Sequence, residues 1–184
     1  MENLGFKHIC CDDIIEEALS PVLKKEGYKG IKDMAKWLGQ PYDKRFKEHE
    51  KNYLKIEDKT LQSLFNNRKK ANIVIDTTGS VIHTSKKALS NLKKNSLIVY
   101  IEASPKMQEE MFESYIKNPK PVVWGNNFKK NAGETNQEAL KKSYKKLLKN
   151  RSRQYESLSD IIIPYDQIDK ISENQFLELI KSKL

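Results

Sequence analysis

The chain has 184 residues, of which 38% are hydrophobic and 32% are charged, and its formal net charge is +9 at pH 7. This length and composition exclude collagen-like and most disordered classes, so we expect a single domain over residues 1–184. A mean hydropathy of −0.74 and the lack of an apolar run of about 18 residues argue against a membrane span. No export signal is visible and the adjacent Cys10 and Cys11 do not suit an ordinary disulfide, so a cytoplasmic location is expected.

Four short runs rich in β-branched residues predict strands. They cover residues 7–11 (KHICC), 72–76 (NIVID), 97–102 (LIVYIE) and 160–164 (DIIIP). Nearly unbroken apolar runs of this kind are typical of strands that are buried on both faces.

Helical patterns lie between and after these runs. We expect helices over 85–94 and 105–117, the second with proline in its first turn. Thr135 with Glu138 has the spacing of a capping box, and Ser172 with Gln175 opens the last helix in the same way. Because strands alternate with helices, the sequence predicts an α/β domain around a parallel sheet, with ligands at the carboxyl ends of the strands.

Two of these strand ends carry residues suited to ligand binding. Asp12 and Asp13 follow the first run, and a glycine-containing turn at 77–80 follows the second. A carboxylate at such a junction can orient or deprotonate a hydroxyl or reach a metal ion, although it is also a common helix N-cap. Small residues in a turn let backbone N–H groups approach a ligand.

The positive charge is concentrated in one region. Residues 129–153 contain nine basic and two acidic side chains. Positive charge concentrated in this way can attract a nucleic-acid backbone, an anionic membrane surface or a small phosphorylated ligand. It is also typical of a helix face that is simply exposed to solvent.

The order and spacing of several segments resemble the shikimate kinase family of small P-loop kinases. Phe46-Lys47-Glu48-His49-Glu50 is similar to the family's Phe-Arg-x-x-Glu, and residues 77–80 stand in place of its triple-glycine turn. The other similar segments are 4–16, 97–105, 120–123 (KPVV, for the family's lid Arg-Pro-Leu-Leu) and 151–155, where Arg151 and Tyr155 match Arg-x-x-x-Tyr.

The resemblance implies a three-layer P-loop kinase-like domain, with a parallel sheet flanked by helices. It implies a substrate-binding helical part over about 30–66 and a lid over about 118–134. The lid segment has no sustained helical or strand period, so we expect a mobile loop in which Trp124 moves from a wet to a drier setting on closure. We expect a monomer.

The activity that the resemblance implies is ATP-dependent phosphoryl transfer to a hydroxyl of a small carboxylic acid, shikimate first, in aromatic amino acid biosynthesis. ATP and Mg²⁺ would be the cofactors. By resemblance, Asp12 orients or deprotonates the acceptor hydroxyl and Lys120 closes over the phosphates. The remaining site residues are Lys47, Gly79 and Arg151 for the acceptor, Arg153 for the nucleotide and Asp76 for the metal.

The sequence also departs from the family's pattern. No Gly-x-x-x-x-Gly-Lys-Ser/Thr motif occurs in the 184 residues, although phosphate binding in such kinases depends on it. Cys10 falls on the first carboxylate of the family's Asp-Thr-Asp, and Lys47 on an arginine. We therefore expect that Met1 is not the true start and that the central strand and its P-loop, about 20 to 25 residues, precede it.

Three alternatives follow from these departures. A related kinase would use a different acceptor, and a kinase-derived domain without a P-loop would bind a ligand but not catalyse. A basic RNA-binding protein is favoured only by the net charge, since no nucleic-acid motif accompanies it.

Overall fold

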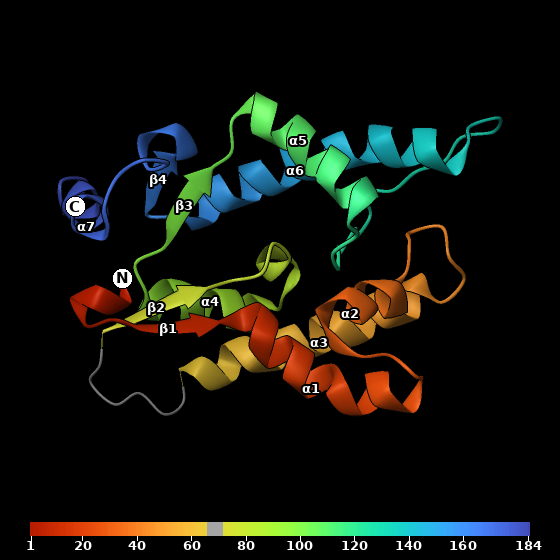
Figure 1. Ribbon diagram of the computed structural model, residues 1–184, viewed down its shortest axis with the longest axis horizontal. Coiled ribbons are helices and arrows are strands. Elements are labelled where there is room, and N and C mark those ends of the chain that lie inside the picture. Colours follow the sequence, from red (N-terminus) through yellow and green to blue (C-terminus); the bar gives the residue numbers. More distant parts are fainter. Residues whose placement is uncertain (66–71) are drawn as a thin grey trace.

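The β-branched runs form the strands, and the amphipathic segments between them form the helices. The computed structural model describes residues 1–65 and 72–184, and it is a mixed α/β structure (Figure 1). The strands are β1 (Lys7–Cys10), β2 (Ile73–Asp76), β3 (Val99–Glu102) and β4 (Ile161–Pro164). The helices are α1 (Cys11–Lys25), α2 (Gly30–Leu38), α3 (Phe46–Leu64), α4 (Lys86–Asn95), α5 (Pro105–Lys117), α6 (Asn136–Leu158) and α7 (Glu173–Lys181).

The strands pair in parallel, as predicted, but in two separate sheets. Cys10 of β1 lies opposite Asp76 of β2, and Glu102 of β3 lies opposite Pro164 of β4. Within the described residues β2 and β3 share no hydrogen-bonded ladder. No residue of β1, β2 or β3 is buried, so the expectation that these runs are covered on both faces is wrong, because β2 and β3 lie at open edges of separate sheets.

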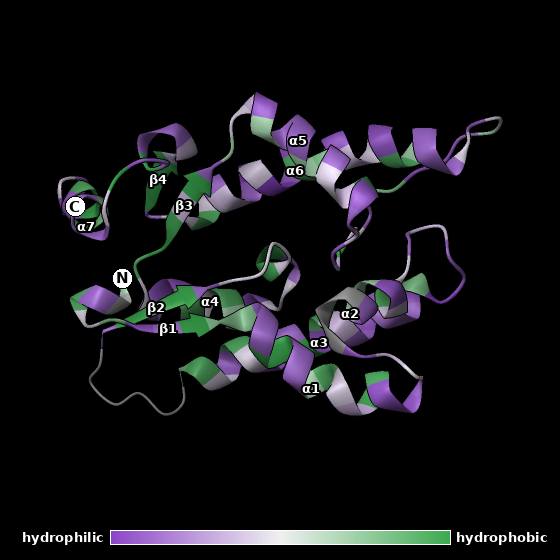
Figure 2. Ribbon diagram, in the orientation of Figure 1, coloured by the Kyte–Doolittle hydropathy of each residue, from purple (hydrophilic) through white to green (hydrophobic). Residues whose placement is uncertain are grey.

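A cleft of about 1110 Å³ separates β2 from β3. Its walls include Ile75 from β2, Val99 and Ile101 from β3, and Phe176 and Ile180 from α7. Apolar side chains and strand edges thus border the same cleft. In Figure 2 the strands are mainly hydrophobic, whereas much of α6 is hydrophilic.

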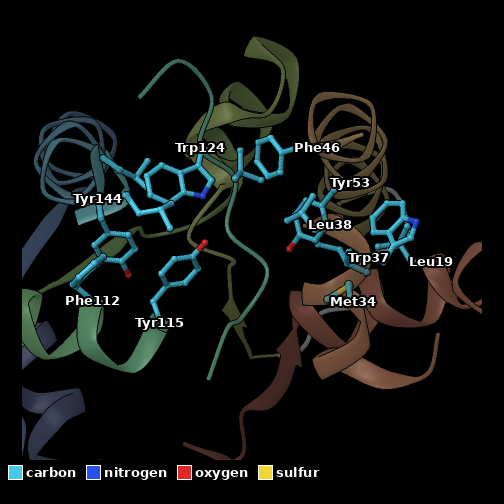
Figure 3. Close-up of a cluster of buried hydrophobic side chains, with 14 of the residues drawn as sticks. Leu19, Met34, Trp37, Leu38, Phe46, Tyr53, Phe112, Tyr115, Trp124 and Tyr144 are labelled. Atoms are coloured by element: carbon cyan, nitrogen blue, oxygen red, sulfur yellow. The ribbon is translucent and has the colours of Figure 1, made fainter. Parts of the chain in front are cut away.

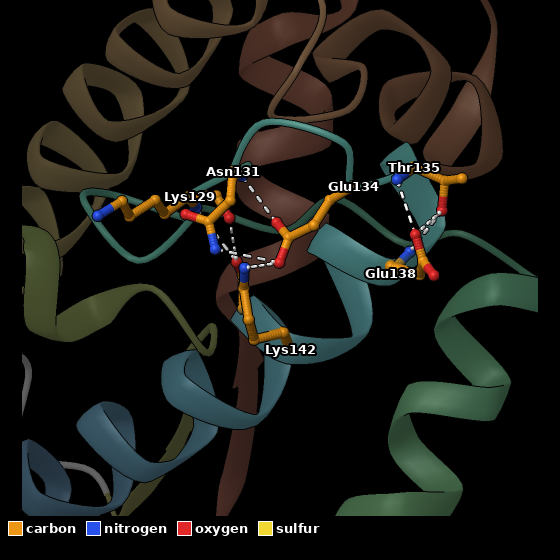
Figure 4. A network of polar contacts seen from close by, with 7 residues as sticks. Lys129, Asn131, Glu134, Thr135, Glu138 and Lys142 are labelled. Carbon is orange, nitrogen blue, oxygen red and sulfur yellow. Dashed lines mark hydrogen bonds and ion pairs between the residues drawn. The ribbon is translucent and has the colours of Figure 1, made fainter.

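Local capping fixes where several helices begin. The Ser104 side chain accepts a hydrogen bond from the Met107 backbone N–H, with Pro105 in the first turn of α5. Both predicted capping boxes are present, at α6 and α7. Figure 4 shows the first of them, with Thr135 and Glu138 bonded to each other.

The main core lies among the helices rather than beside the sheets. It joins α1, α2 and α3 to α5, α6 and the loop after α5, and Figure 3 shows its aromatic side chains. Trp37 and Trp124 are its largest members and are 2% and 0% exposed. None of the helices within the described ranges is long and apolar enough to cross a bilayer.

The predicted acceptor-binding part, 30–66, contains α2 and α3 and the connection between them. Its last residue lies outside the described residues. Trp37 packs in the core and stacks on His49, with ring centroids 4.4 Å apart. Trp37 is therefore a packing residue of this part of the chain.

Candidate functional site

Asp12 lies just beyond the carboxyl end of β1, in the first turn of α1. The β1–β2 register places Cys10 opposite Asp76, so the two aspartates lie at the same sheet edge. Burial raises the pKa of Asp12, the negative charge of Asp76 raises it further, and the positive charge of Lys120 lowers it. The structure therefore places Asp12 and Asp76 at one sheet edge, and the charge of Lys120 acts on Asp12 there.

This arrangement predicts how the pKa of Asp12 responds to its neighbours. We expect Asp76→Asn to lower that pKa because it removes a negative charge, and Lys120→Ala to raise it because it removes a positive one. Carboxyl-detected NMR titration of the Asp12 side chain measures both shifts. Lys24→Ala is the control, because Lys24 lies about 18 Å further along α1 and its charge is screened at that distance. Equal pKa values in all variants would contradict the arrangement.

Gly79 and Arg151 form a second pair. A Cβ atom at Gly79 would lie 2.8 Å from Nη1 of Arg151. The Tyr155 hydroxyl donates to the Gly79 carbonyl over 2.5 Å, and Nη2 of Arg151 donates to the Val123 carbonyl over 2.9 Å. Only a residue without a side chain allows the guanidinium to approach this turn so closely.

Lys47 reaches the same loop as Arg151. Its Nζ donates to the Gly125 carbonyl over 2.6 Å and to Glu50 over 3.0 Å. The two cations that the sequence assigned to the acceptor carboxylate thus converge on the loop between Val123 and Gly125.

Glu50 holds that loop against α3. One oxygen of its buried carboxylate accepts hydrogen bonds from the backbone N–H groups of Trp124, at 2.7 Å, and Gly125, at 2.8 Å. The other oxygen accepts the bond from Lys47. Glu50 therefore links the first cation to the loop backbone.

The loop does not match the expected mobile lid around Trp124. Residues 118–135 form neither helix nor strand, as predicted. However, Trp124 is 0% exposed and packs edge-on against Tyr115 and Tyr144 (Figure 3). The expectation that its indole starts in a wet setting is wrong, because the aromatic cluster and the Glu50 carboxylate already bury this part of the loop.

The far end of the loop is tied to α6. The Glu134 carboxylate accepts from the Asn131 backbone N–H over 2.7 Å and pairs with Lys142 (Figure 4). Lys120, at the near end, is exposed. Any closing motion therefore concerns Lys120 and its neighbours rather than Trp124.

Arg153 is not brought to this group. It lies two residues after Arg151 on α6 and is exposed. Two residues correspond to about 200° around a helix, so the two side chains leave α6 on different sides. Its nucleotide-binding role stays a prediction.

Sequence reasoning missed one buried carboxylate, Glu57, which is 1% exposed on α3. It accepts hydrogen bonds from Thr78 and Ser80, on either side of Gly79. A signal was present: Phe46, Glu50, Tyr53, Glu57 and Leu61 recur at helical spacing and share one face of α3. Two acidic residues on an otherwise apolar face point to buried carboxylates with specific partners.

The carboxylates of Asp12 and Asp76 are the groups at the β1–β2 sheet edge that could reach a metal ion. In residues 1–65 and 72–184 no group of three or more His, Cys, Asp or Glu side chains is arranged to hold a metal. Mg²⁺ in kinases is held by one or two carboxylates together with substrate phosphates. Asp76 supplies one such carboxylate at this edge.

Two comparisons with known proteins complete these findings. A family model described as "Shikimate kinase" matches residues 33–181. This range includes Lys47, Asp76, Gly79, Lys120 and Arg151, while Asp12 precedes it. A search of curated proteins found no match.

Proposed function

The chain belongs to the shikimate kinase family, and we propose that it transfers the γ-phosphoryl group of ATP to a hydroxyl of a small carboxylic acid, with shikimate as the first candidate. A kinase-like function follows from the family. The acceptor, the cofactors and the residue roles below are the proposal.

The observation that carries the proposal is that Asp12 and Arg151 belong to one electrostatic neighbourhood. Both act on the pKa of Glu57, which Asp12 raises and Arg151 lowers, although burial is its largest influence. Asp12 also follows the β1 strand end that pairs with Asp76, which lies three residues before Gly79. The Arg151 guanidinium lies against Gly79. An acceptor that carries a hydroxyl and a carboxylate fits between Asp12 and Arg151.

The residues have distinct tasks in this reaction. The acceptor hydroxyl oxygen attacks the γ-phosphorus, the bond to the β–γ bridging oxygen breaks, and Asp12 takes the hydroxyl proton. Arg151 and Lys47 hold the acceptor carboxylate, and the Gly79 backbone lies beside it. Lys120 neutralises charge on the transferred group, and Arg153 contributes to nucleotide binding.

The raised pKa of Asp12 supports its role as a base. A carboxylate of higher pKa accepts a proton more readily, provided that it is ionised at the working pH. Asp76 would hold the Mg²⁺ that accompanies ATP. The metal, when bound, neutralises phosphate charge.

The cleft between β2 and β3 supports the expected additional strand. A further strand paired in parallel with these two edges would complete one sheet, and the loop after it would lie at the edge that carries Asp12 and Gly79. A phosphate-binding loop at that place would face the acceptor site. We propose this position for the Gly-x-x-x-x-Gly-Lys-Ser/Thr segment, within a single domain that contains α2, α3 and the loop at 118–134.

The test combines binding and turnover. We expect shikimate to bind the chain in calorimetry, and we expect ³¹P NMR to show transfer from Mg-ATP when the assayed protein includes the phosphate-binding segment. Arg151→Ala should weaken shikimate binding at least tenfold, as for the loss of a charged hydrogen-bonding partner. Lys145→Ala, on the exposed surface of α6, is the matched control.

The outcomes separate the alternatives. Binding of shikimate without transfer in the extended protein would favour a ligand-binding domain that is not a catalyst. Transfer to another hydroxylated acid, with the same sensitivity to Arg151→Ala, would change only the substrate. No binding and no transfer would overturn the proposal.

A further inference from the structure

Glu57 is the most deeply buried carboxylate among the described residues, at 1% exposed. It lies in the second half of α3, and its two bonded partners are neutral hydroxyl groups rather than cations. Burying a carboxylate costs several kcal/mol unless its oxygens are well satisfied. Such a group is expected where its hydrogen bonds fix something specific.

The two partners flank a single residue of the acceptor site. Oε1 of Glu57 accepts from the Thr78 hydroxyl, and Oε2 accepts from the Ser80 hydroxyl over 2.7 Å. The Thr78 oxygen also accepts from the Ser80 backbone N–H over 3.1 Å, and the two hydroxyl oxygens are 2.9 Å apart. These bonds close a tight turn around Gly79, with the carboxylate bridging both arms.

The other side of Gly79 faces α6. There the Arg151 guanidinium lies against the glycine, and the Tyr155 hydroxyl donates to its carbonyl. Gly79 itself is exposed. The turn is thus held by α3 on its buried side and contacts the acceptor-binding arginine on its open side.

From this geometry we infer that Glu57 is a positioning residue. Its carboxylate fixes the turn around Gly79 and thereby sets the place at which Arg151 meets the acceptor. Glu57 does not touch the acceptor, and its effect passes through Thr78 and Ser80. This inference rests on the proposed function for its consequence in binding, but the geometry of the turn can be tested without any ligand.

The charge of Glu57 is part of this role. A carboxylate accepts from both hydroxyls at once, whereas an amide offers one accepting oxygen and one donating nitrogen. In Glu57→Gln one hydroxyl must therefore turn to accept, and the loss of its bond to a charged acceptor is expected to let its arm of the turn shift. Burial raises the pKa of Glu57, while the two hydroxyls and Arg151 lower it. Asp12 raises it, and Cys11 and Tyr53 also lie within its field.

The experiment compares Glu57→Gln with Asp58→Asn in the same 184-residue chain. Asp58 is the next residue on α3 and accepts from the Ser85 backbone N–H over 2.7 Å, away from Gly79. We expect Glu57→Gln to raise the Kd for shikimate about tenfold, the loss typical of one charged hydrogen bond. We expect Asp58→Asn to leave that Kd within twofold.

A second measurement reads the turn directly. The Gly79 backbone amide and the Arg151 Nε–H group give NMR signals in the ligand-free protein. Glu57→Gln should shift both signals, and Asp58→Asn should leave both in place. This separates positioning from stability, because a variant that is merely less stable keeps its folded-state signals.

A third variant removes the polar groups together. Glu57→Leu with Thr78→Val and Ser80→Ala removes the carboxylate and both hydroxyls together, so neither side of these two bonds is left unpaired. The backbone N–H of residue 80 loses the Thr78 oxygen as its acceptor, and a lower free energy of unfolding is expected from that change. A folded triple variant that binds shikimate more weakly than the parent supports the positioning role, and one that binds it as tightly as the parent overturns that role.

If the parent chain binds no shikimate, the proposed function fails. The NMR shifts then decide the positioning role, and unchanged Gly79 and Arg151 signals in Glu57→Gln would overturn it.

Discussion

Glu50→Ala is expected to lower the free energy of unfolding by about 3 kcal/mol, which corresponds to a fall in Tm of roughly 6–12 °C for a chain of this size. The alanine leaves the backbone N–H groups of Trp124 and Gly125 without the oxygen that they share in the parent. It also leaves Lys47 without its carboxylate partner. A buried donor that loses its acceptor costs about 1–3 kcal/mol, so two such donors account for the effect.

Glu48→Ala is the matched control. Glu48 lies two residues earlier, in the first turn of α3, but is exposed, so we expect a loss below about 1 kcal/mol. Thermal and urea unfolding of the two variants measure the difference. Equal stability of Glu50→Ala and Glu48→Ala would show that Glu50 does not hold the loop.

Asp12→Asn is expected to lower kcat by about 10²–10⁴-fold, the range for loss of a general base. The asparagine amide cannot take the acceptor proton, but it is nearly the same size as the carboxylate. The KM for the acceptor should therefore change little, in contrast to Arg151→Ala, which should mainly raise KM. Steady-state kinetics in a preparation that phosphorylates its acceptor provide both constants.

Asp13→Asn serves as the control for that measurement. Asp13 is the neighbouring residue on α1, but it is exposed, and its substitution should leave kcat within about twofold. If Asp12→Asn and Asp13→Asn behaved alike, Asp12 would have no role in proton transfer. A fall in kcat of tenfold or more for Asp13→Asn would show that the base had been assigned to the wrong residue.

The elements could be predicted because their signals are local. The β-branched runs predicted the four strands that residues 1–65 and 72–184 contain, and the two capping boxes predicted the starts of α6 and α7. The split into two sheets was not predicted, because the sequence analysis expected a single parallel sheet. Strand pairing depends on contacts between segments that are far apart in the sequence, so the pattern of a single segment does not predict it.

The site was predictable where it depends on strand ends. Asp12 and Gly79 follow the two predicted strand runs and Asp76 ends the second of them, and parallel pairing brings such residues to one edge. Trp124 was misjudged because its burial depends on Tyr115 and Tyr144, which belong to two different helices. Glu57 was missed because its partners, Thr78 and Ser80, are more than 20 residues away in the sequence.

The separation of the two sheets has a consequence for the order in which the chain can fold. The β1–β2 pair is made entirely from residues 7–76, and the β3–β4 pair from residues 99–164. A ribosome adds about 5–20 residues per second, so the first pair can close seconds before the second has been synthesised. During that interval Trp37 and Phe46 lack the Trp124 and Tyr144 side chains of their core. Until α6 has left the exit tunnel, the first half of the chain therefore exposes apolar core side chains, and this is the part that a chaperone is expected to bind.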